Sequence, residues 1–245
     1  MRYLILSDLH ANLEASRAVL EDARRRGFDE ILCLGDVVGY GGDPNAVVDL
    51  VRSIELRAIV RGNHDKVAAG MEDGESFSDV ARVAAAWTHE TLTADNRRWL
   101  ADLPRGPLDV GGFLISHGTP IEEDAYILGD IDADVAFAAA PFHLAFFGHS
   151  HLACVFVARQ GAVETVIPVP EGDPIRVDAG ARYLVNPGSI GQPRDQDVRA
   201  AYALYDREAG LVVLHRIAYD VASAQRKITE QGLPAALALR LQYGV

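Results

Sequence analysis

Cysteine is scarce in this chain of 245 residues, which has only Cys33 and Cys154. Two cysteines are too few for a disulfide framework, so a reducing compartment is the expected environment. The N-terminus also lacks the long apolar region of a secretory signal, because Ser7 and Asp8 follow directly on a short apolar run. A cytoplasmic location is the resulting expectation.

Long hydrophobic runs and an excess of positive charge are missing as well. The longest apolar stretches, at 83–87 and 135–142, fall far short of the roughly 20 residues that cross a bilayer. Lys and Arg total 23 against 35 Asp and Glu, a net charge of −12. Such a chain has no long-range attraction for nucleic acid or an anionic membrane, so we expect neither as a partner. A phosphate substrate would need a local reversal of charge, which divalent cations supply.

Apolar runs alternate with helical patterns in the N-terminal half of the chain. Strands are predicted at 3–6, 31–34, 58–60, 113–116 and 144–147. Helices are predicted at 13–26, 44–53, 78–92, 93–103 and 132–140. The second of these helices begins at Asp43-Pro44, with the carboxylate as N-cap and proline at the first helical position.

The sequence pattern changes after Ala153, where the predicted strands become shorter and their apolar and polar residues alternate more regularly. They lie at 155–158, 163–169, 183–185, 202–205 and 212–217, and a helical tail follows at 220–241. This pattern predicts a largely antiparallel second sheet. Because no repeat or flexible linker divides the chain, we expect one α/β domain over residues 1–245.

Polar clusters follow five of the predicted strands. They are Asp8-Leu9-His10, Gly35-Asp36, Gly62-Asn63-His64-Asp65, Ser116-His117-Gly118 and Gly148-His149-Ser150-His151. Ligand sites of α/β folds gather at the carboxyl ends of strands, so these loops are expected to converge. Carboxylate, carboxamide and imidazole groups without a thiolate suit Mn²⁺, Fe²⁺, Co²⁺, Ni²⁺ or Zn²⁺. The glycines allow the backbone to approach the site where a Cβ atom would clash.

Each cluster taken alone is weak evidence for a metal site. An isolated strand-end histidine is more often a structural residue than a ligand, and Asp-X-His is a common string. Gly-Asn-His-Asp and Gly-His-Ser-His are rarer. Five clusters in this order, each after a predicted strand, favour a shared metal site over coincidence.

Together the five clusters resemble the pattern of the calcineurin-like metallophosphoesterase superfamily, and most closely its small bacterial and archaeal phosphoesterases. That pattern is Asp-X-His, Gly-Asp, Gly-Asn-His-Asp or -Glu, a lone His and Gly-His-X-His, and all of it is present between Asp8 and His151. The resemblance implies a four-layer αββα sandwich of two mixed β-sheets flanked by helices. It also implies two divalent metal ions, with manganese favoured and iron, nickel, cobalt, zinc or magnesium as alternatives.

The resemblance also assigns metal-binding roles. The implied ligands of one ion are Asp8, His10 and His151. The implied ligands of the other are Asn63, His117 and His149. Asp36 would bridge the two ions.

Four further residues receive roles near the substrate. His64 would face the scissile phosphate as a catalytic residue, and Asp65 would orient its ring. Family members carry a run like 186–195 of this chain beside the metals, which makes Asn12 and Arg194 candidate substrate contacts. A helix cap for Asn12 and a solvated loop charge for Arg194 are the competing interpretations.

The resemblance favours a small-molecule substrate. Protein serine/threonine phosphatases extend the second block to Gly-Asp-X-X-Asp-Arg-Gly, but the run here, from Gly35 to Gly41, has no arginine. The expected reaction is hydrolysis of a phosphodiester or phosphomonoester, for example a nucleotide, by hydroxide that the two cations activate. A nuclease and a non-catalytic interaction scaffold are the alternatives; the acidic composition disfavours the first and the complete ligand set the second. Family members often form dimers or tetramers, so a homo-oligomer is compatible with the resemblance.

Overall fold

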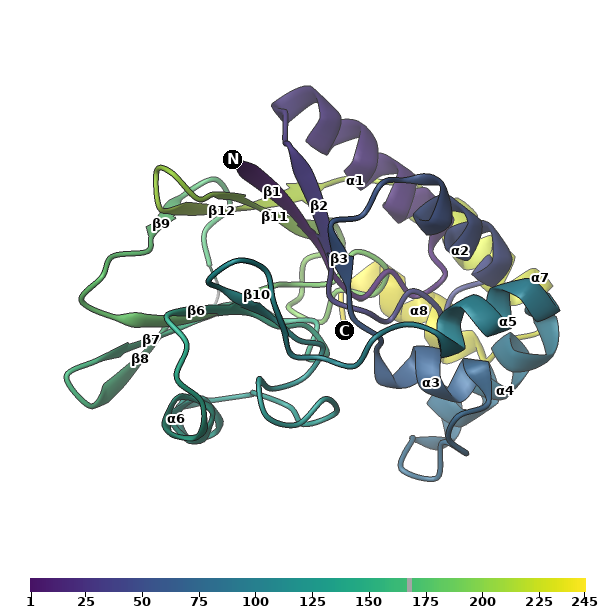
Figure 1. The fold of residues 1–245 in the computed structure, drawn as a ribbon. Coiled ribbons are helices and arrows are strands. Elements are labelled where there is room, and N and C mark those ends of the chain that lie inside the picture. Colours follow the sequence, from purple (N-terminus) through teal and green to yellow (C-terminus); the bar gives the residue numbers. More distant parts are fainter. Residues whose placement is uncertain (167–168) are drawn as a thin grey trace.

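Two six-stranded β-sheets form the centre of the computed structural model, which describes residues 1–166 and 169–245 (Figure 1). The strands of the first sheet are β1 (Arg2–Leu6), β2 (Glu30–Cys33), β3 (Ala58–Ile59), β9 (Pro174–Arg176), β11 (Ala200–Asp206) and β12 (Leu211–Ile217). Their order is β3-β2-β1-β11-β12-β9. Strands β1, β2 and β3 are parallel, whereas β11 pairs with β1 in the antiparallel direction, so the sheet is mixed.

The second sheet is mixed as well. Its strands are β4 (Leu108–Asp109), β5 (Leu114–Ile115), β6 (Leu144–Phe146), β7 (Ala153–Arg159), β8 (Ala162–Val166) and β10 (Arg182–Pro187). Their order is β4-β5-β6-β10-β7-β8, with β5, β6 and β10 parallel and the other pairs antiparallel.

Eight helices lie outside the sheets in the described part of the chain. They are α1 (Leu13–Arg26), α2 (Pro44–Ser53), α3 (Asn63–Ala69), α4 (Asp79–Thr91), α5 (Ala94–Ala101), α6 (Asp130–Ala139), α7 (Val221–Glu230) and α8 (Ala235–Tyr243). In Figure 1, α1 and α2 cover the outer face of the first sheet and α6 covers the second. None of the described helices is long and apolar enough to cross a membrane.

The side-chain alternation of β1 shows why the sheets form inner layers. Leu4 and Leu6 belong to the apolar cluster under α1, whereas Tyr3 and Ile5 belong to the cluster between the two sheets. Successive strand residues point to opposite faces, and a strand buried on both faces must be apolar throughout. A third cluster, which includes Phe137 of α6, fills the space between the second sheet and its helix. The predicted four-layer sandwich is confirmed.

The prediction of one second sheet for all strands after Ala153 was wrong. Strands β7, β8 and β10 do join the second sheet, but β11 and β12 extend the first sheet beside β1. Alternation of apolar and polar residues identifies a half-buried strand but does not specify the strand that pairs with it. The buried edge of β1 needs a partner strand, and β11 fills that position. Of the strand predicted at 163–169, residues 167–168 lie outside the described part.

The predicted helices agree closely with the structure, with two local corrections. Asp43 precedes α2, but its carboxylate makes no cap hydrogen bond and instead lies 2.6 Å from Lys227 Nζ. Helix α3 was not predicted, because Gly62 to Asp65 was interpreted as a loop. It begins at Asn63, and Asp65 accepts a hydrogen bond from the Gly62 N–H (3.0 Å), as the third residue of a capping box does.

Candidate metal centre

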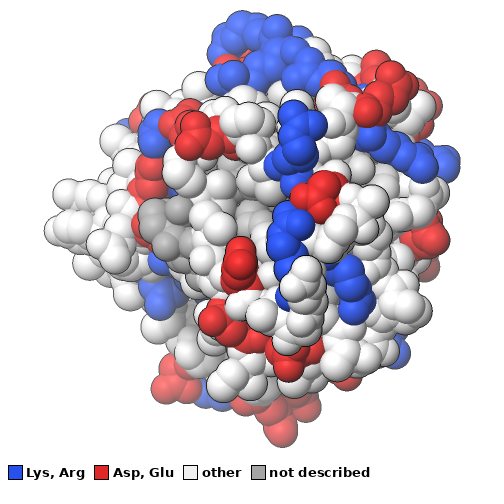
Figure 2. All heavy atoms as spheres, turned by 90° about the vertical axis from the view of Figure 1, so that its left-hand side faces the viewer, with Lys and Arg blue, Asp and Glu red and all other residues white. Residues whose placement is uncertain are grey.

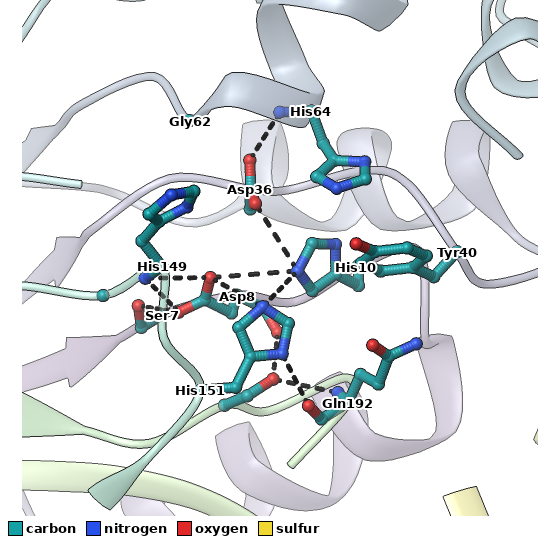
Figure 3. A network of polar contacts seen from close by, with 12 residues as sticks. Ser7, Asp8, His10, Asp36, Tyr40, Gly62, His64, His149, His151 and Gln192 are labelled. Atoms are coloured by element: carbon teal, nitrogen blue, oxygen red, sulfur yellow. Dashed lines mark hydrogen bonds and ion pairs between the residues drawn. The ribbon is translucent and has the colours of Figure 1, made fainter. Parts of the chain in front are cut away.

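The strand-end loops meet at one edge of the sandwich, where backbone hydrogen bonds join them to one another. Asp8 N–H donates to Gly35 O (3.1 Å), and His10 N–H donates to Asp36 O (2.9 Å). Gly191 N–H donates to Asp8 O (2.8 Å), which brings the 186–195 run beside the same loops. Figure 3 shows the resulting cluster of carboxylates and imidazoles.

The backbone of this cluster is unusual because side-chain-bearing residues adopt positive φ angles. Five of the predicted ligands lie in this region: Asp8 (53°), His10 (47°), Asp36 (51°), His149 (66°) and His151 (61°). L-residues avoid the left-handed region, and such conformations persist only where surrounding structure holds them, typically at functional sites.

Four of the predicted ligands form one group, with potential ligand atoms all within 4.8 Å of one another. Its members are Asp8, His10, Asp36 and His151. His10 Nε2 lies 3.0 Å from His151 Nε2 and 3.5 Å from Asp36 Oδ2. His151 Nε2 lies 3.4 Å from Asp8 Oδ1. All four side chains are buried.

A second group of potential ligand atoms contains Asp36, His117 and His149. His117 Nε2 lies 3.4 Å from Asp36 Oδ2 and 3.1 Å from His149 Nδ1. The half-buried Asn63 joins this group, since its Oδ1 is 3.1 Å from His117 Nε2. The structure therefore brings all seven predicted ligands together, in two groups that share Asp36.

Asp36 occupies the middle of the cluster because Gly62 leaves room for it. A Cβ atom at Gly62 would lie only 2.0 Å from Asp36 Oδ1. That oxygen accepts a hydrogen bond from the His64 backbone N–H (2.9 Å), which leaves Oδ2 directed between the two groups (Figure 3). Gly148 has the same function beside Ser7, whose Oγ would be 2.3 Å from an added Cβ.

Hydrogen bonds at Nδ1 fix the tautomer that three imidazoles adopt when they are neutral. The Nδ1 atoms of His10, His117 and His151 contact the carbonyl oxygens of Val38 (3.0 Å), Leu34 (2.8 Å) and Gln192 (2.6 Å), respectively. A carbonyl only accepts, so each Nδ1 carries the proton and each neutral ring presents a lone pair at Nε2.

These lone pairs make the donor set suitable for cations. In their neutral forms the Nε2 atoms of His10 and His151 face each other at 3.0 Å as two acceptors, which is unfavourable unless a cation lies between them. Imidazole nitrogens with carboxylate and carboxamide oxygens match the ligand preferences of borderline divalent metals. The arrangement fits the metal ions that the resemblance implies.

Burial and mutual charge move the pKa values of these groups in opposite directions. Burial raises the pKa of Asp8 to about 7. Burial alone would raise the pKa of Asp36 too, but the neighbouring imidazoles, His117 above all, hold it well below its usual range. Burial lowers the pKa of His117, but the Asp36 carboxylate more than offsets this and raises it to about 10. A proton on His117 thus balances the charge of Asp36, and a divalent cation would replace it.

His64 lies at the edge of the cluster with its ring packed between Tyr40 and Phe77, at centroid distances of 4.3 and 4.5 Å. Burial lowers the pKa of His64 to about 4. Its Nδ1 is buried and has no hydrogen-bond partner among the described residues.

The expectation that Asp65 orients the His64 ring was wrong. The Asp65 carboxylate accepts hydrogen bonds from the backbone N–H groups of Gly62 (3.0 Å) and Val38 (3.1 Å). Those two bonds use both carboxylate oxygens, because Asp65 lies in the first turn of α3 and closes its capping box. Asp65 therefore holds two of the strand-end loops in place.

A cleft of about 320 Å³ opens over the cluster. Its lining includes Asp36, Asn63, His64, His149, His151 and Arg194, together with Tyr40, Phe77, Tyr126 and Arg240. Arg194 Nη2 lies 3.0 Å from Gln192 Oε1 and 3.3 Å from the Tyr40 hydroxyl, whereas its buried Nε has no partner among the described residues. Arg194 therefore faces the cleft with unused hydrogen-bonding capacity.

Asn12 is placed differently from Arg194. Its Oδ1 accepts from Ala15 N–H (3.1 Å) as the N-cap of α1, and its Nδ2 donates to Gly191 O (2.9 Å). Both polar atoms are engaged, and Asn12 does not line the cleft. The helix-cap interpretation is supported, and the substrate-contact interpretation is not.

The sequence analysis missed the aromatic side chains of the cleft. The Tyr126 ring stacks on His149 at a centroid distance of 3.8 Å, and Tyr40 packs against both His10 and His64. Tyr40 stands in the glycine-rich continuation of the second cluster, which was an available signal. Tyr126 lies in a segment without a motif, so only the tertiary structure reveals it.

The fold and the donor set together define an α/β sandwich with a buried cluster of metal-ligating groups at the ends of its strands. The family model of the calcineurin-like phosphoesterase superfamily domain matches residues 1–210. An uncharacterized protein of Methanocaldococcus jannaschii is 36% identical over 245 residues, covering 98% of this chain and 97% of the relative.

Solved structures agree with this match. A metallophosphoesterase from Sphaerobacter thermophilus is 39% identical, with a TM-score of 0.87 over 100% of this chain and 99% of that one. A hypothetical protein from Pyrococcus horikoshii OT3, at 21% identity, shares the fold with a TM-score of 0.78 over 100% and 98% of the two chains. The present chain belongs to the calcineurin-like phosphoesterase superfamily.

Proposed function

We propose that this protein is a hydrolase that holds two divalent cations and cleaves a phosphate ester of a small molecule. The observation that carries the proposal is the position of Asp36. Its Oδ2 lies 3.5 Å from His10 Nε2 in one group and 3.4 Å from His117 Nε2 in the other. One carboxylate oxygen thus reaches both groups, as a bridging ligand must.

Asp8, His10 and His151 would hold one cation, and Asn63, His117 and His149 would hold the other. When bound, paired cations lower the pKa of coordinated water to near neutrality and offset the charge that develops on phosphate oxygens during an in-line displacement. Manganese is the favoured metal, with iron, nickel, cobalt, zinc and magnesium as alternatives, because the donor set accepts all of them.

The side chains at the cleft have separate roles in this proposal. Arg194 supplies a guanidinium for phosphate oxygens, which it binds more specifically than a lysine would. With a pKa lowered to about 4, His64 is neutral near pH 7, so its ring stabilises the leaving oxygen by donating a hydrogen bond. A bound phosphate dianion would raise the pKa of His64 and allow full proton transfer.

Cleft size and surface charge support a small-molecule substrate over a nucleic acid. A volume of about 320 Å³ is at the lower end of the range of small-ligand sites, which extends from about 300 to 1,000 Å³. On the face shown in Figure 2, acidic and uncharged side chains interrupt the basic ones. A net charge of −12 also gives the chain no long-range attraction for a nucleic acid.

The test is a metal titration combined with a substrate panel. Metal-depleted protein should bind two Mn²⁺ per chain by calorimetry, and the loaded protein should hydrolyse bis(p-nitrophenyl) phosphate, p-nitrophenyl phosphate or a nucleotide. Binding of a single ion would contradict the paired centre. Two bound ions without turnover of any ester would favour the interaction-scaffold alternative.

A further inference from the structure

The cleft contains a second arginine, Arg240, which lies beyond the segment that the family model matches. That model ends at residue 210, whereas Arg240 belongs to α8 near the C-terminus. Arg240 and Arg194 line the same cleft, together with the catalytic candidate His64. The C-terminal helices therefore contribute a cationic side chain to a site that is otherwise built from strand-end loops.

Helix α8 is held firmly in the position that directs Arg240 to the cleft. Leu237 and Leu241 are almost fully buried in an apolar cluster that also contains the cleft residue Tyr40. The end of the helix is hydrogen-bonded to the segment after Arg194, since Gln196 N–H donates to Gly244 O (2.8 Å). Arg240 is one helical turn before this contact.

Neither arginine is neutralised by a carboxylate. Within the described residues, Arg240 makes no side-chain hydrogen bond or ion pair, and the polar partners of the Arg194 side chain, Tyr40, Gln192 and Tyr126, are neutral groups. The salt bridges of the described chain, within 4.0 Å, include neither residue, although the chain carries 35 acidic residues. Two unpaired guanidinium groups in one cleft of an acidic protein indicate an anionic ligand.

Glu72 and Asp124, two acidic residues of the cleft lining, do not serve as partners, because both pair with Lys66. Lys66 is almost completely buried, and its Nζ lies 2.8 Å from Glu72 and in contact with Asp124. The third carboxylate of this network, Glu123, pairs with Arg61 at 3.0 Å. Arg105 also lies 3.7 Å from Glu123, so three cations face these three carboxylates and the charge of Arg194 and Arg240 is available to a ligand.

We propose that Arg240 is a specificity-determining residue that binds a second phosphate group of the substrate while the metal centre holds the scissile one. The proposal rests on the phosphoesterase function proposed above and narrows its substrate class to compounds with at least two phosphate groups, such as nucleoside diphosphates. The Arg194 N–H donates to the carbonyl oxygen of the metal-ligand candidate His151 (3.3 Å), so in this proposal Arg194 contacts the bridging region of such a substrate. A guanidinium recognises phosphate through paired hydrogen bonds.

The test compares two slowly hydrolysed nucleotides with one and two phosphate groups. Adenosine 5′-thiomonophosphate and α,β-methylene-ADP are titrated into manganese-loaded protein by calorimetry and used as inhibitors of p-nitrophenyl ester hydrolysis, with free Mn²⁺ held constant. Wild type should bind α,β-methylene-ADP roughly tenfold or more tightly, the effect of one charge-assisted hydrogen bond. Arg240→Gln should abolish that preference and leave binding of the monophosphate unchanged.

Two further variants complete the comparison. Arg240→Lys should restore part of the preference, because it returns the charge without the planar guanidinium. Arg226→Gln, at an exposed arginine of α7 outside the cleft, should keep the wild-type ratio. An unchanged ratio in Arg240→Gln, an equal loss for both ligands, or no preference in wild type would overturn the proposal. Calorimetry measures the preference for the diphosphate even if the protein hydrolyses no ester. Absence of hydrolysis would contradict the proposed phosphoesterase function, and not the role of Arg240 in ligand binding.

Discussion

Replacing Asp36 by Asn is the most direct perturbation of the metal centre. Asp36 Oδ1 accepts the His64 N–H at 2.9 Å, and an Asn side chain can keep that bond with its own Oδ1. The amide NH₂ then takes the place of Oδ2, 3.5 Å from His10 Nε2 and 3.4 Å from His117 Nε2. It would donate hydrogen bonds to the very lone pairs that a cation needs, while the bridging charge is lost. Both sites should therefore fail together.

The size of the effect follows from the role of the residue. Loss of an indirect partner of a metal ligand costs about 10–100-fold in affinity, so loss of a shared ligand should cost more than about 10²-fold for each ion. At metal concentrations of about 100 times Kd, each wild-type site adds about 2.7 kcal/mol of stability. Two sites add about 5 kcal/mol, which for a chain of this size corresponds to a rise in Tm of roughly 10–20 °C. Asp36→Asn should show almost none of this rise.

The assay measures bound Mn²⁺ after gel filtration and Tm with and without metal. Asp8→Asn is the matched control, since Asp8 belongs to only one of the two groups and its loss should weaken one ion more than the other. In the absence of metal, Asp36→Asn should be less stable than wild type, because the carboxylate that balances the charge of protonated His117 has been removed, so the quantity compared is the metal-induced rise in Tm. Retention of one tightly bound ion by Asp36→Asn would refute the bridging assignment.

Three other variants test separate parts of the argument. His64→Ala should retain both ions, because the backbone N–H of residue 64 contacts Asp36, yet lose about 10²–10⁴-fold in kcat; loss of metal would contradict this role. Gly62→Ala places a Cβ 2.0 Å from Asp36 Oδ1 and should abolish metal binding, whereas Gly129→Ala, with nothing within 4 Å, should bind metal normally by calorimetry. Burial lowers the pKa of His215 to about 4, whereas the unfolded chain titrates near 6.5, so this residue contributes stability above pH 6.5 that is lost as the pH falls toward 4. His215→Gln should flatten the decline of Tm with pH over this window, and parallel curves for the two proteins would contradict that expectation.

The convergence of the five clusters was predictable from sequence because each motif stands immediately after a strand, whereas the assignment of ligands came from the family resemblance. Hydrophobic runs place β1, β2 and β6, and parallel neighbours deliver their C-terminal loops to one edge of a sheet. The pairing of strands that lie far apart in the sequence was harder to predict. The sequence of β11 indicates a buried strand, but its position beside β1 depends on which edge remains open after β2 and β3 have paired.

The short helix α3 and the placement of Asp65 show a different limit of sequence analysis. Seven residues form a helix there because Gly62 and Asp65 cap its start and α4 and α5 pack against it, not because of helix periodicity. The carboxylate that follows His64 in sequence points to the backbone of Gly62 and Val38, away from the imidazole. Adjacency in a motif therefore did not indicate contact in the structure.

Motif analysis also could not identify the groups that orient the metal-binding histidines, because these groups are backbone carbonyls. His10, His117 and His151 each donate from Nδ1 to a carbonyl oxygen of another strand-end loop. Every residue has a backbone carbonyl, so the side chains at these positions do not reveal this function.

The same loops hold their ligands at positive φ, at a cost of about 1–3 kcal/mol each, and the cross-loop hydrogen bonds make that conformation persist. The Nε2 lone pairs are consequently directed inward by the backbone of the fold itself, before any cation arrives. Metal binding then requires little rearrangement, and a cation at His117 would replace the proton that this ring otherwise takes up.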